Sequence, residues 1–348
     1  MEKGLISVIT PCYNTGKYIH NLLDSLLCQT YPKVEIFAVD DGSTDNTAEI
    51  IKSYIPKFKL KGYSLNYIFQ KNSGQSVAIN NALKLINGEF FVWPDSDDFY
   101  ASKDSLAILK ETLDKSDYNV SMVRCLYSYL DQNDLSMIWQ QKDEPYMHKD
   151  NLFEDCLFQL NGWNFCPGGY MVRMDIFDKC IPNRDIYTEH DAGQNWQLMT
   201  PLLYNYKCVT IPKHLYNTVV RRESHSHGQY KTYEEIRRKF KSYENTILGT
   251  LDRMPFLNVD ERIRYQKAIR LKYARIQLNI CYTHKKKEDS KKVEKYIRKE
   301  LGVHLSLGEK MDSTFCCVPG YFTLKNFPKK VYNRTKGLAI VVLRKLFK

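Results

Sequence analysis

The sequence predicts an α/β protein with a doubly wound mixed sheet, followed by a basic, mainly helical C-terminal region. Three observations point to this fold class. Short β-rich runs alternate with helical segments over the first 130 residues, and polar residues follow each of those runs. The charge is also uneven, because residues 231–348 hold 29 basic and 12 acidic residues, a net of +17, which leaves −6 for residues 1–230 within a total of +11.

Four short apolar runs predict buried parallel strands, since such strands are covered by helices on both faces. They lie at residues 5–10, 34–40, 65–69 and 89–94. Segments with apolar residues at helical spacing lie between them, at residues 17–29, 45–54 and 73–86. The order β-α-β-α-β-α-β predicts helices on both faces of the sheet and a ligand site at the carboxyl ends of its strands.

The remainder of the chain is expected to add further strands and then helices. A strand is predicted at residues 170–173 and a strand pair at residues 209–219. Three helices are predicted after Gln229, at residues 233–248, 260–281 and 291–301. This change of character divides the chain into two predicted domains, residues 1–230 and residues 231–348.

Cysteine spacing and hydropathy exclude several other classes of protein. The ten cysteines form no Cys-x-x-Cys pair, so we expect reduced, mostly buried thiols and neither a disulfide framework nor a zinc site. No apolar run approaches the roughly 20 residues that span a bilayer, and residues 1–10 read as a strand where a signal peptide would place its apolar core. We therefore expect a cytoplasmic protein.

Polar residues gather at the end of each predicted strand. The four segments concerned are residues 10–14 (Thr-Pro-Cys-Tyr-Asn), 40–45 (Asp-Asp-Gly-Ser-Thr-Asp), 71–76 (Lys-Asn-Ser-Gly-Gln-Ser) and 95–98 (Asp-Ser-Asp-Asp). Because the carboxyl ends of parallel strands meet at one edge of a sheet, these segments are predicted to line one crevice. The segment 40–45, taken alone, is typical of a turn and helix cap.

The pair Asp95 and Asp97 indicates a cation site. Two carboxylates two residues apart at a strand end repel each other unless a cation lies beside them. Oxygen ligands suit a hard divalent ion, which keeps positions for water and for diphosphate oxygens. The sequence therefore predicts Mn²⁺ or Mg²⁺ held against a nucleotide.

These motifs, in this order and at this spacing, resemble the family 2 glycosyltransferases of GT-A fold. The strong matches are residues 7–14, Gln29-Thr30-Tyr31, residues 40–45, Asn72-x-Gly74 with Asn80, and residues 95–98. Weaker matches follow at Trp163, Gly168-Gly169, residues 193–196 and Arg221-x-x-Ser224-x-Ser226-His227. The resemblance covers roughly residues 1–230, and it implies a nucleotide-binding half at residues 1–100 and an acceptor half at residues 101–230.

The resemblance implies a nucleotide site at the first strand ends. Pro11 and Tyr13 would line the base, and Asp41 would accept the imide hydrogen of uracil, which favours a UDP-sugar donor. Further nucleotide contacts are expected from Asn14, Asn72 and Gly74. One departure is Ile79, which stands where the family often has an arginine.

The resemblance also assigns the diphosphate and metal contacts. Asp95 would contact the ribose and Asp97 the metal, in the usual order of the Asp-x-Asp motif. Arg221 would bind phosphate, and His227 would complete the metal shell as part of a lid over the diphosphate.

The implied reaction is an inverting transfer, in which an acceptor hydroxyl displaces the nucleoside diphosphate and a carboxylate removes the hydroxyl proton. Many relatives carry a Glu-Asp pair before an aromatic residue, but the corresponding residues here are Gln194, Asn195 and Trp196. The nearest carboxylates make Asp191 our first candidate for the base and Glu189 our second. The alternative for Asp191 is an ordinary helix N-cap.

The acceptor and the partners are less closely specified. Trp163 and Gly169 are candidate acceptor contacts, the alternative being that Trp163 packs against the sheet. A glycan or lipid-linked oligosaccharide of a bacterial surface polysaccharide is the acceptor class implied by the family. Residues 338–348 combine an apolar block with cations, so the tail either lies on the anionic inner face of the membrane or packs as a terminal helix.

The sequence also bears on two other functions. A sugar-nucleotide-binding subunit with little activity of its own is an alternative, because Ile79 and the two amides replace expected functional groups. Nucleic acid is not an expected partner, because no RNP, helix-turn-helix or zinc motif accompanies the basic region. The oligomeric state is left open.

Overall fold

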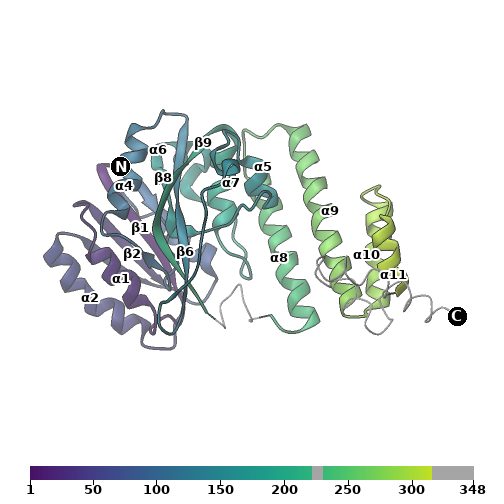
Figure 1. Ribbon diagram of the computed structural model, residues 1–348, viewed down its shortest axis with the longest axis horizontal. Coiled ribbons are helices and arrows are strands. Elements are labelled where there is room, and N and C mark those ends of the chain that lie inside the picture. The colour runs from purple at the N-terminus through teal and green to yellow at the C-terminus, as the bar shows by residue number, and fades with distance from the viewer. Residues whose placement is uncertain (222–229, 316–348) are drawn as a thin grey trace. The chain divides into compact units, whose positions relative to one another are not determined.

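The computed structural model describes residues 1–221 and 230–315 (Figure 1). It divides into two compact units. One comprises residues 1–231 and 241–266, and the other comprises residues 232–240 and the chain from residue 267. Two long helices, α8 (Tyr233–Asp252) and α9 (Val259–Thr283), supply residues to both units.

Within the described residues, nine strands of the first unit form one mixed sheet in the order β3-β2-β1-β4-β8-β6-β9-β5, with β7 paired to β6. The strands are β1 (Glu2–Cys12), β2 (Val34–Asp40), β3 (Ser64–Phe69), β4 (Gly88–Val92), β5 (Phe99–Tyr100), β6 (Val120–Asp131), β7 (Met137–Gln140), β8 (Tyr170–Arg173) and β9 (Lys207–Val220). The first four are parallel neighbours, whereas β8 runs antiparallel to β4 and β6. The predicted α/β class and mixed sheet are confirmed.

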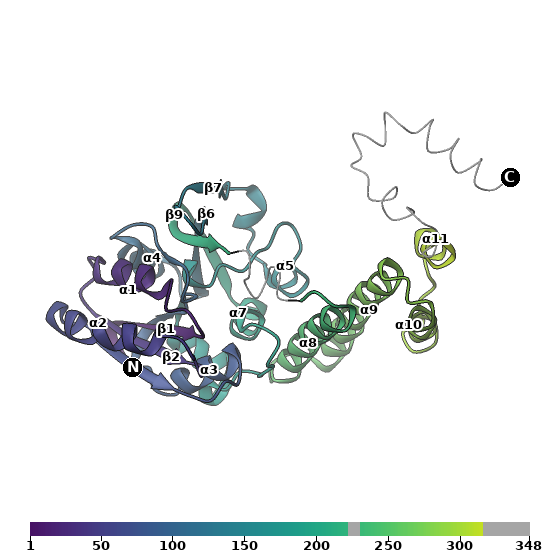
Figure 2. The same ribbon diagram turned by 90° about the horizontal axis from the view of Figure 1, so that it is seen from below.

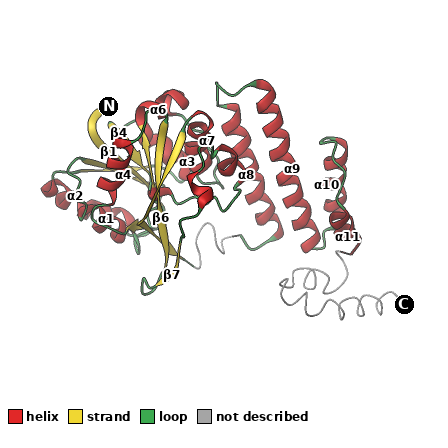
Figure 3. Ribbon diagram, turned by 45° about the horizontal axis from the view of Figure 1, so that its top comes forward, coloured by secondary structure: helices red, strands yellow, loops and turns green. Residues whose placement is uncertain are grey.

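Helices cover both faces of this sheet (Figure 3). The α-helices of the first unit are α1 (Ile19–Leu27), α2 (Thr47–Lys61), α3 (Gln75–Leu83), α4 (Ser105–Lys115), α5 (Phe153–Phe158), α6 (Met174–Cys180) and α7 (Asn195–Asn205). Buried apolar side chains on β1 and β2 account for this arrangement, since strands covered on both faces need helices on each side. Because β1 to β4 are parallel, their carboxyl ends lie at the same edge of the sheet.

The structure corrects two predictions about individual elements. Residues 207–220 form the single strand β9, not a strand pair, and it lies parallel to the long strand β6. Helix α2 continues through Pro56 to Lys61, beyond the predicted end at residue 54. It stops at Gly62, whose φ of +84° is the left-handed conformation that commonly terminates helices.

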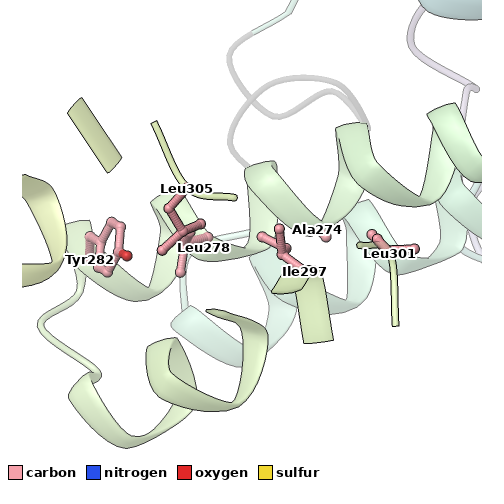
Figure 4. Close-up of a cluster of buried hydrophobic side chains, with 6 residues drawn as sticks. All are labelled: Ala274, Leu278, Tyr282, Ile297, Leu301 and Leu305. Carbon is pink, nitrogen blue, oxygen red and sulfur yellow. The ribbon is translucent and has the colours of Figure 1, made fainter. Parts of the chain in front are cut away.

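The predicted helical C-terminal region is confirmed over its described part. In the second unit, α10 (Lys287–Lys299) and α11 (Leu307–Phe315) follow the C-terminal part of α9. Figure 4 shows the apolar cluster formed by Ala274, Leu278, Tyr282, Ile297, Leu301 and Leu305. The Tyr282 hydroxyl and Ser313 Oγ both donate to the buried Glu294 carboxylate, at 2.9 and 2.8 Å.

Two predictions concern features of the whole chain. The eight cysteines in the described residues are unpaired thiols, and seven of them are buried, as expected. None of the described helices combines the length and the apolar character needed to cross a bilayer. The predicted membrane-associated segment 338–348 lies outside the described residues.

Candidate functional site

The loops after β1 and β2 are tied together by Asn14. Its backbone N–H donates to Ser43 Oγ at 3.0 Å, and its Oδ1 accepts the backbone N–H of Thr44 at 2.8 Å. Asn14 has a φ of +50°, a conformation that asparagine tolerates better than most residues. Pro11 is buried just before this loop, whereas the side chain of Tyr13 is 50% exposed.

Asp41 is almost fully buried and its carboxylate is held by the chain itself. Oδ1 accepts hydrogen bonds from Gln70 Nε2 at 2.8 Å and from the Ser73 backbone at 2.7 Å, and Oδ2 accepts one from the Gly74 backbone at 2.9 Å. These bonds fix the β3–α3 loop against the end of β2. Asp41 therefore has a structural role, which does not depend on a bound ligand.

The β3–α3 loop is pressed against the segment that precedes α7. Gly74 has a φ of +93°, and a Cβ placed on it would lie 3.1 Å from both Cα and the carbonyl oxygen of His190. His190 Nε2 lies 3.2 Å from Asn72 Oδ1. Ser76 Oγ donates to the Glu189 carbonyl and accepts from the Glu189 backbone N–H, at 3.2 and 3.1 Å. The predicted nucleotide residues Asn72 and Gly74 thus lie beside the predicted base candidates.

Three aspartates at the end of β4 occupy different environments. Asp98 is buried, and its Oδ1 accepts the Val219 backbone N–H of β9 at 2.8 Å. Burial, together with Asp97, raises the pKa of the Asp95 carboxyl to about 7. Asp97 forms an ion pair with Arg221, whose Nε lies 2.6 Å from Asp97 Oδ2. Asp98 is therefore part of the framework, whereas Asp95 and Asp97 face other charged or polar side chains.

One of the two amides at the start of α7 contacts a carboxylate of this group, and the other contacts Trp93. Gln194 forms a side-chain hydrogen bond with Asp95, and Asn195 Oδ1 accepts the indole N–H of Trp93 at 3.0 Å. Gln194 is 1% exposed and its Oε1 has no hydrogen-bond partner within the described residues. The sequence identified this segment as the one that carries acids in relatives, but it did not predict the contact with Asp95.

Arg221 lies at the site, though in contact with a carboxylate. Besides the ion pair with Asp97, its guanidinium lies over the ring of Tyr18, with 5.0 Å between Cζ and the ring centroid. An arginine that makes these two contacts in the free protein can still bind phosphate when a ligand is present. The other predicted lid residue, His227, lies outside the described residues.

The two base candidates differ in their surroundings. The Glu189 carboxylate faces α8, where Ser242 Oγ and Asn245 Nδ2 donate to it at 3.4 and 3.5 Å, and the Tyr187 hydroxyl approaches at 3.4 Å. The side chain of Asp191 is 23% exposed and lies 3.3 Å from His190 Nδ1. The N-cap of α7 is Gln194, so the alternative that Asp191 caps this helix is wrong.

Trp163 is only 6% exposed, with the guanidinium of Arg124 4.7 Å from its ring centroid. Its neighbour Gly168 is required for packing, because a Cβ there would lie 2.1 Å from the ring of Tyr216. Gly169 is also buried, but a Cβ there would lie 3.4 Å from Cys125 Sγ, which is an ordinary van der Waals contact. These contacts are those expected from the alternative interpretation, in which Trp163 packs against the sheet.

Comparisons with known proteins agree with this fold. The family model described as glycosyl transferase family 2 matches residues 7–181, slightly more than half of the chain. The chain therefore belongs to glycosyl transferase family 2. It is 36% identical over 143 residues to an uncharacterized glycosyltransferase of Rickettsia typhi, covering 41% of this chain and 42% of the relative. It is 32% identical over 163 residues to glycosyltransferase GlyG of Streptococcus pneumoniae, covering 47% and 46%. The chain thus matches less than half the length of these curated relatives.

Solved structures show the same fold at low sequence identity. S. aureus TarS 1–349 in complex with UDP-GlcNAc has a TM-score of 0.54 and 20% identity, covering 94% of this chain and 82% of TarS 1–349. The mannosyltransferase PcManGT of Pyrobaculum calidifontis, in complex with GDP-Man and Mn²⁺, has a TM-score of 0.52 and 17% identity, covering 89% and 83%. Both confirm the GT-A-type fold.

Proposed function

We propose that this protein is an inverting glycosyltransferase that moves a sugar from a UDP-sugar to a hydroxyl of a glycan or lipid-linked oligosaccharide. The observation that carries the proposal is the carboxylate pair Asp95 and Asp97, which meets Gln194 and Arg221 at the end of β4 in a family 2 domain. TarS was solved with UDP-GlcNAc and PcManGT with GDP-Man, which supports a nucleotide-sugar donor. Synthesis of a bacterial surface polysaccharide is the proposed role.

The donor nucleotide is proposed to lie across the ends of β1, β2 and β4. Pro11 and the half-exposed Tyr13 would line the base, and Asp95 would contact the ribose. Asp41 would accept the uracil imide hydrogen with a lone pair left over from its three internal hydrogen bonds, since two carboxylate oxygens offer about four acceptor sites. The loops that complete this edge are held by Asn14, Asn72 and Gly74.

A divalent cation, Mn²⁺ or Mg²⁺, fits the oxygen donors at the end of β4. No three His, Cys, Asp or Glu side chains cluster as metal ligands within residues 1–221 and 230–315. Such ions, however, often take one or two carboxylates and fill the other positions with water and phosphate oxygens. Asp97 would hold the cation, with His227 as a further ligand, and Arg221 would turn from Asp97 to the diphosphate. When bound, the cation offsets the charge of the departing diphosphate.

The acceptor hydroxyl needs a base, and Asp191 is proposed for that role ahead of Glu189. The Glu189 carboxylate already accepts hydrogen bonds from Tyr187, Ser242 and Asn245, which orient it towards α8. Asp191 is partly exposed beside His190, in the segment that contacts the β3–α3 loop. A carboxylate in that position can remove the proton as the hydroxyl attacks the anomeric carbon, without a covalent intermediate.

A sugar-nucleotide-binding subunit with little intrinsic activity is the second candidate. Gln194 and Asn195 favour it, because they contact Asp95 and Trp93 respectively where relatives carry acids, and an amide accepts no proton at neutral pH. Such a protein would bind the donor without turning it over.

The experiment that tests the proposal screens UDP-sugars and GDP-Man for thermal stabilisation of the full chain in the presence of Mn²⁺. Donors that stabilise are then incubated with lipid-linked oligosaccharide preparations, and nucleoside diphosphate release is measured. We expect acceptor-dependent release of UDP from wild type and none from Asp97→Ala. Stabilisation without release would favour the binding subunit, and stabilisation by no donor would contradict both functions.

A further inference from the structure

The β6–β7 hairpin carries three aromatic side chains in mutual contact, Tyr127, Tyr129 and Trp139, which we call the aromatic shelf. The ring centroids lie 5.3 Å apart for Tyr127 and Tyr129, 5.4 Å for Tyr129 and Trp139, and 5.9 Å for Tyr127 and Trp139. Strand β7 lies beside β6 and outside the main strand order (Figure 2). Trp139 is 45% exposed, Tyr129 is half-buried and Tyr127 is buried, so the surface that the shelf presents to solvent is made by Trp139 and part of Tyr129.

The inner part of the shelf is fixed by polar contacts. Asn164 Nδ2 donates to the hydroxyl of Tyr127 at 2.6 Å and to that of Tyr129 at 2.9 Å. The same loop bears Cys166, whose Sγ lies 3.7 Å from Thr218 Oγ1 on β9. The rings that Trp139 packs against are therefore fixed before a ligand binds, which lowers the entropic cost of binding at Trp139.

A row of neighbouring side chains connects the shelf to the aspartates at the end of β4. Tyr129 is the register partner of Trp139 on β7 and of Thr218 on β9. Thr218 in turn forms a side-chain hydrogen bond with Asp98, which directly follows Asp97 in the chain. Two strand spacings separate Trp139 from Thr218, roughly 10 Å. A short oligosaccharide spans this distance, which ends at Thr218 beside the framework residue Asp98.

We propose that the aromatic shelf binds the acceptor glycan at sugar residues beyond the one that carries the attacking hydroxyl. The inference rests on the proposed function. The C–H faces of pyranose rings are apolar and pack against aromatic rings, while their hydroxyls need polar neighbours such as Asn164 at the edge of the shelf. This surface, and not the buried Trp163, becomes the acceptor contact of this domain.

A second copy of the chain is a weaker candidate for the occupant. Strand β7 has only four residues, and its pairing with β6 is irregular between Tyr129 and Leu130. Short and bulged edge strands resist pairing with another edge. A glycan needs no such pairing, because it contacts the rings.

The test uses an array of defined bacterial surface glycans probed with the full chain. We compare wild type, Trp139→Ala, Trp139→Phe and, as a control, Leu60→Ala, which changes a 90% exposed side chain on α2. We expect wild type, Leu60→Ala and Trp139→Phe to retain the same glycans, and Trp139→Ala to lose at least about tenfold in affinity. All four tryptophans lie in described residues and the other three are at most 6% exposed, so a bound glycan should also protect wild-type fluorescence from acrylamide.

Three results would overturn the inference: no glycan retained by wild type, equal retention by Trp139→Ala, or a wild-type dimer in sedimentation that Trp139→Ala abolishes. Measuring the affinity for UDP in the presence of Mn²⁺ distinguishes a failure of this inference from a failure of the proposed function. Trp139→Ala should bind UDP like wild type, because the shelf contacts no proposed donor residue. Loss of glycan binding by this variant with normal UDP binding supports the shelf, whereas a wild type that binds no UDP contradicts the proposed function.

Discussion

Carboxylates at the strand ends of this domain serve two purposes at the residue scale. Asp41 and Asp98 accept backbone hydrogen bonds that join neighbouring loops and strands. Burial, with Asp97 and Asp95 nearby, raises the pKa of Asp98 well above its usual value. Asp95 and Asp97 instead meet the side chains of Gln194 and Arg221 and are the pair available to a ligand.

The proposed base gives a prediction at this scale. Asp191→Asn should keep donor binding and lower turnover by at least about 10²-fold, the scale of a lost general base. Turnover is measured as UDP release in the presence of acceptor, with donor affinity measured separately by titration.

Glu189→Gln is the matched control, because it keeps the length of the side chain and one oxygen that can accept from either Ser242 or Asn245. It should retain most of the turnover. If Glu189→Gln loses turnover while Asp191→Asn keeps it, the order of the two candidates is reversed. If both variants stay active, the base lies elsewhere.

At the scale of elements, the β3–α3 loop and the segment before α7 depend on a close approach at Gly74. We predict that Gly74→Ala lowers the free energy of unfolding by at least roughly 2 kcal/mol, because it combines a conformation that only glycine adopts readily with a Cβ 3.1 Å from the His190 backbone. It should also weaken UDP binding. Chemical denaturation and UDP titration measure the two effects.

Gly62→Ala is the control, since Gly62 also has a positive φ but a Cβ there meets nothing within 4 Å. It should cost only about 1 kcal/mol, the strain of the left-handed conformation, and leave UDP binding unchanged. Equal losses for the two variants would mean that the contact with His190 has no energetic weight.

The sequence predicted the elements whose signals are local. The first four strands and the helices between them were recognised because apolar periodicity and turn residues lie within each segment. β5 has only two residues and is defined by its pairing with β9, so no local pattern could indicate it. β6 contains the buried Arg124, which a local pattern treats as surface although it bonds Thr210 and the Met147 carbonyl.

In the candidate site too, local patterns could be predicted and contacts between distant residues could not. Motifs at strand ends predicted that the proposed donor contacts share one edge, and the strands that precede them are parallel neighbours in the sheet. The contacts of Asp95 with Gln194 and of Asp97 with Arg221 join residues about 100 or more positions apart, so spacing could not predict them. The aromatic shelf was missed because its exposed apolar residues, on the four-residue strand β7, have no motif.

At the scale of the whole molecule, the basic C-terminal region remains a predicted membrane contact. Residues 331–348 lie outside the described residues and contain basic but no acidic side chains. Each cation near an anionic surface contributes about 1 kcal/mol, so deleting this segment should release the protein from anionic liposomes. UDP binding should persist. Co-sedimentation unchanged by the deletion, or equally strong on neutral lipid, would contradict the prediction.

The affinity of the protein for UDP, measured with and without Mn²⁺, tests the role proposed for the carboxylate pair at the end of β4. Without a cation, Asp95 and Asp97 disfavour the diphosphate and Asp97 keeps Arg221 in its ion pair, so wild type should bind UDP much more tightly in Mn²⁺ than in chelator. Asp97→Ala should lose most of this difference, while Leu60→Ala should keep it. Equal wild-type affinity in the two conditions, or an undiminished Mn²⁺ effect in Asp97→Ala, would contradict the proposed site.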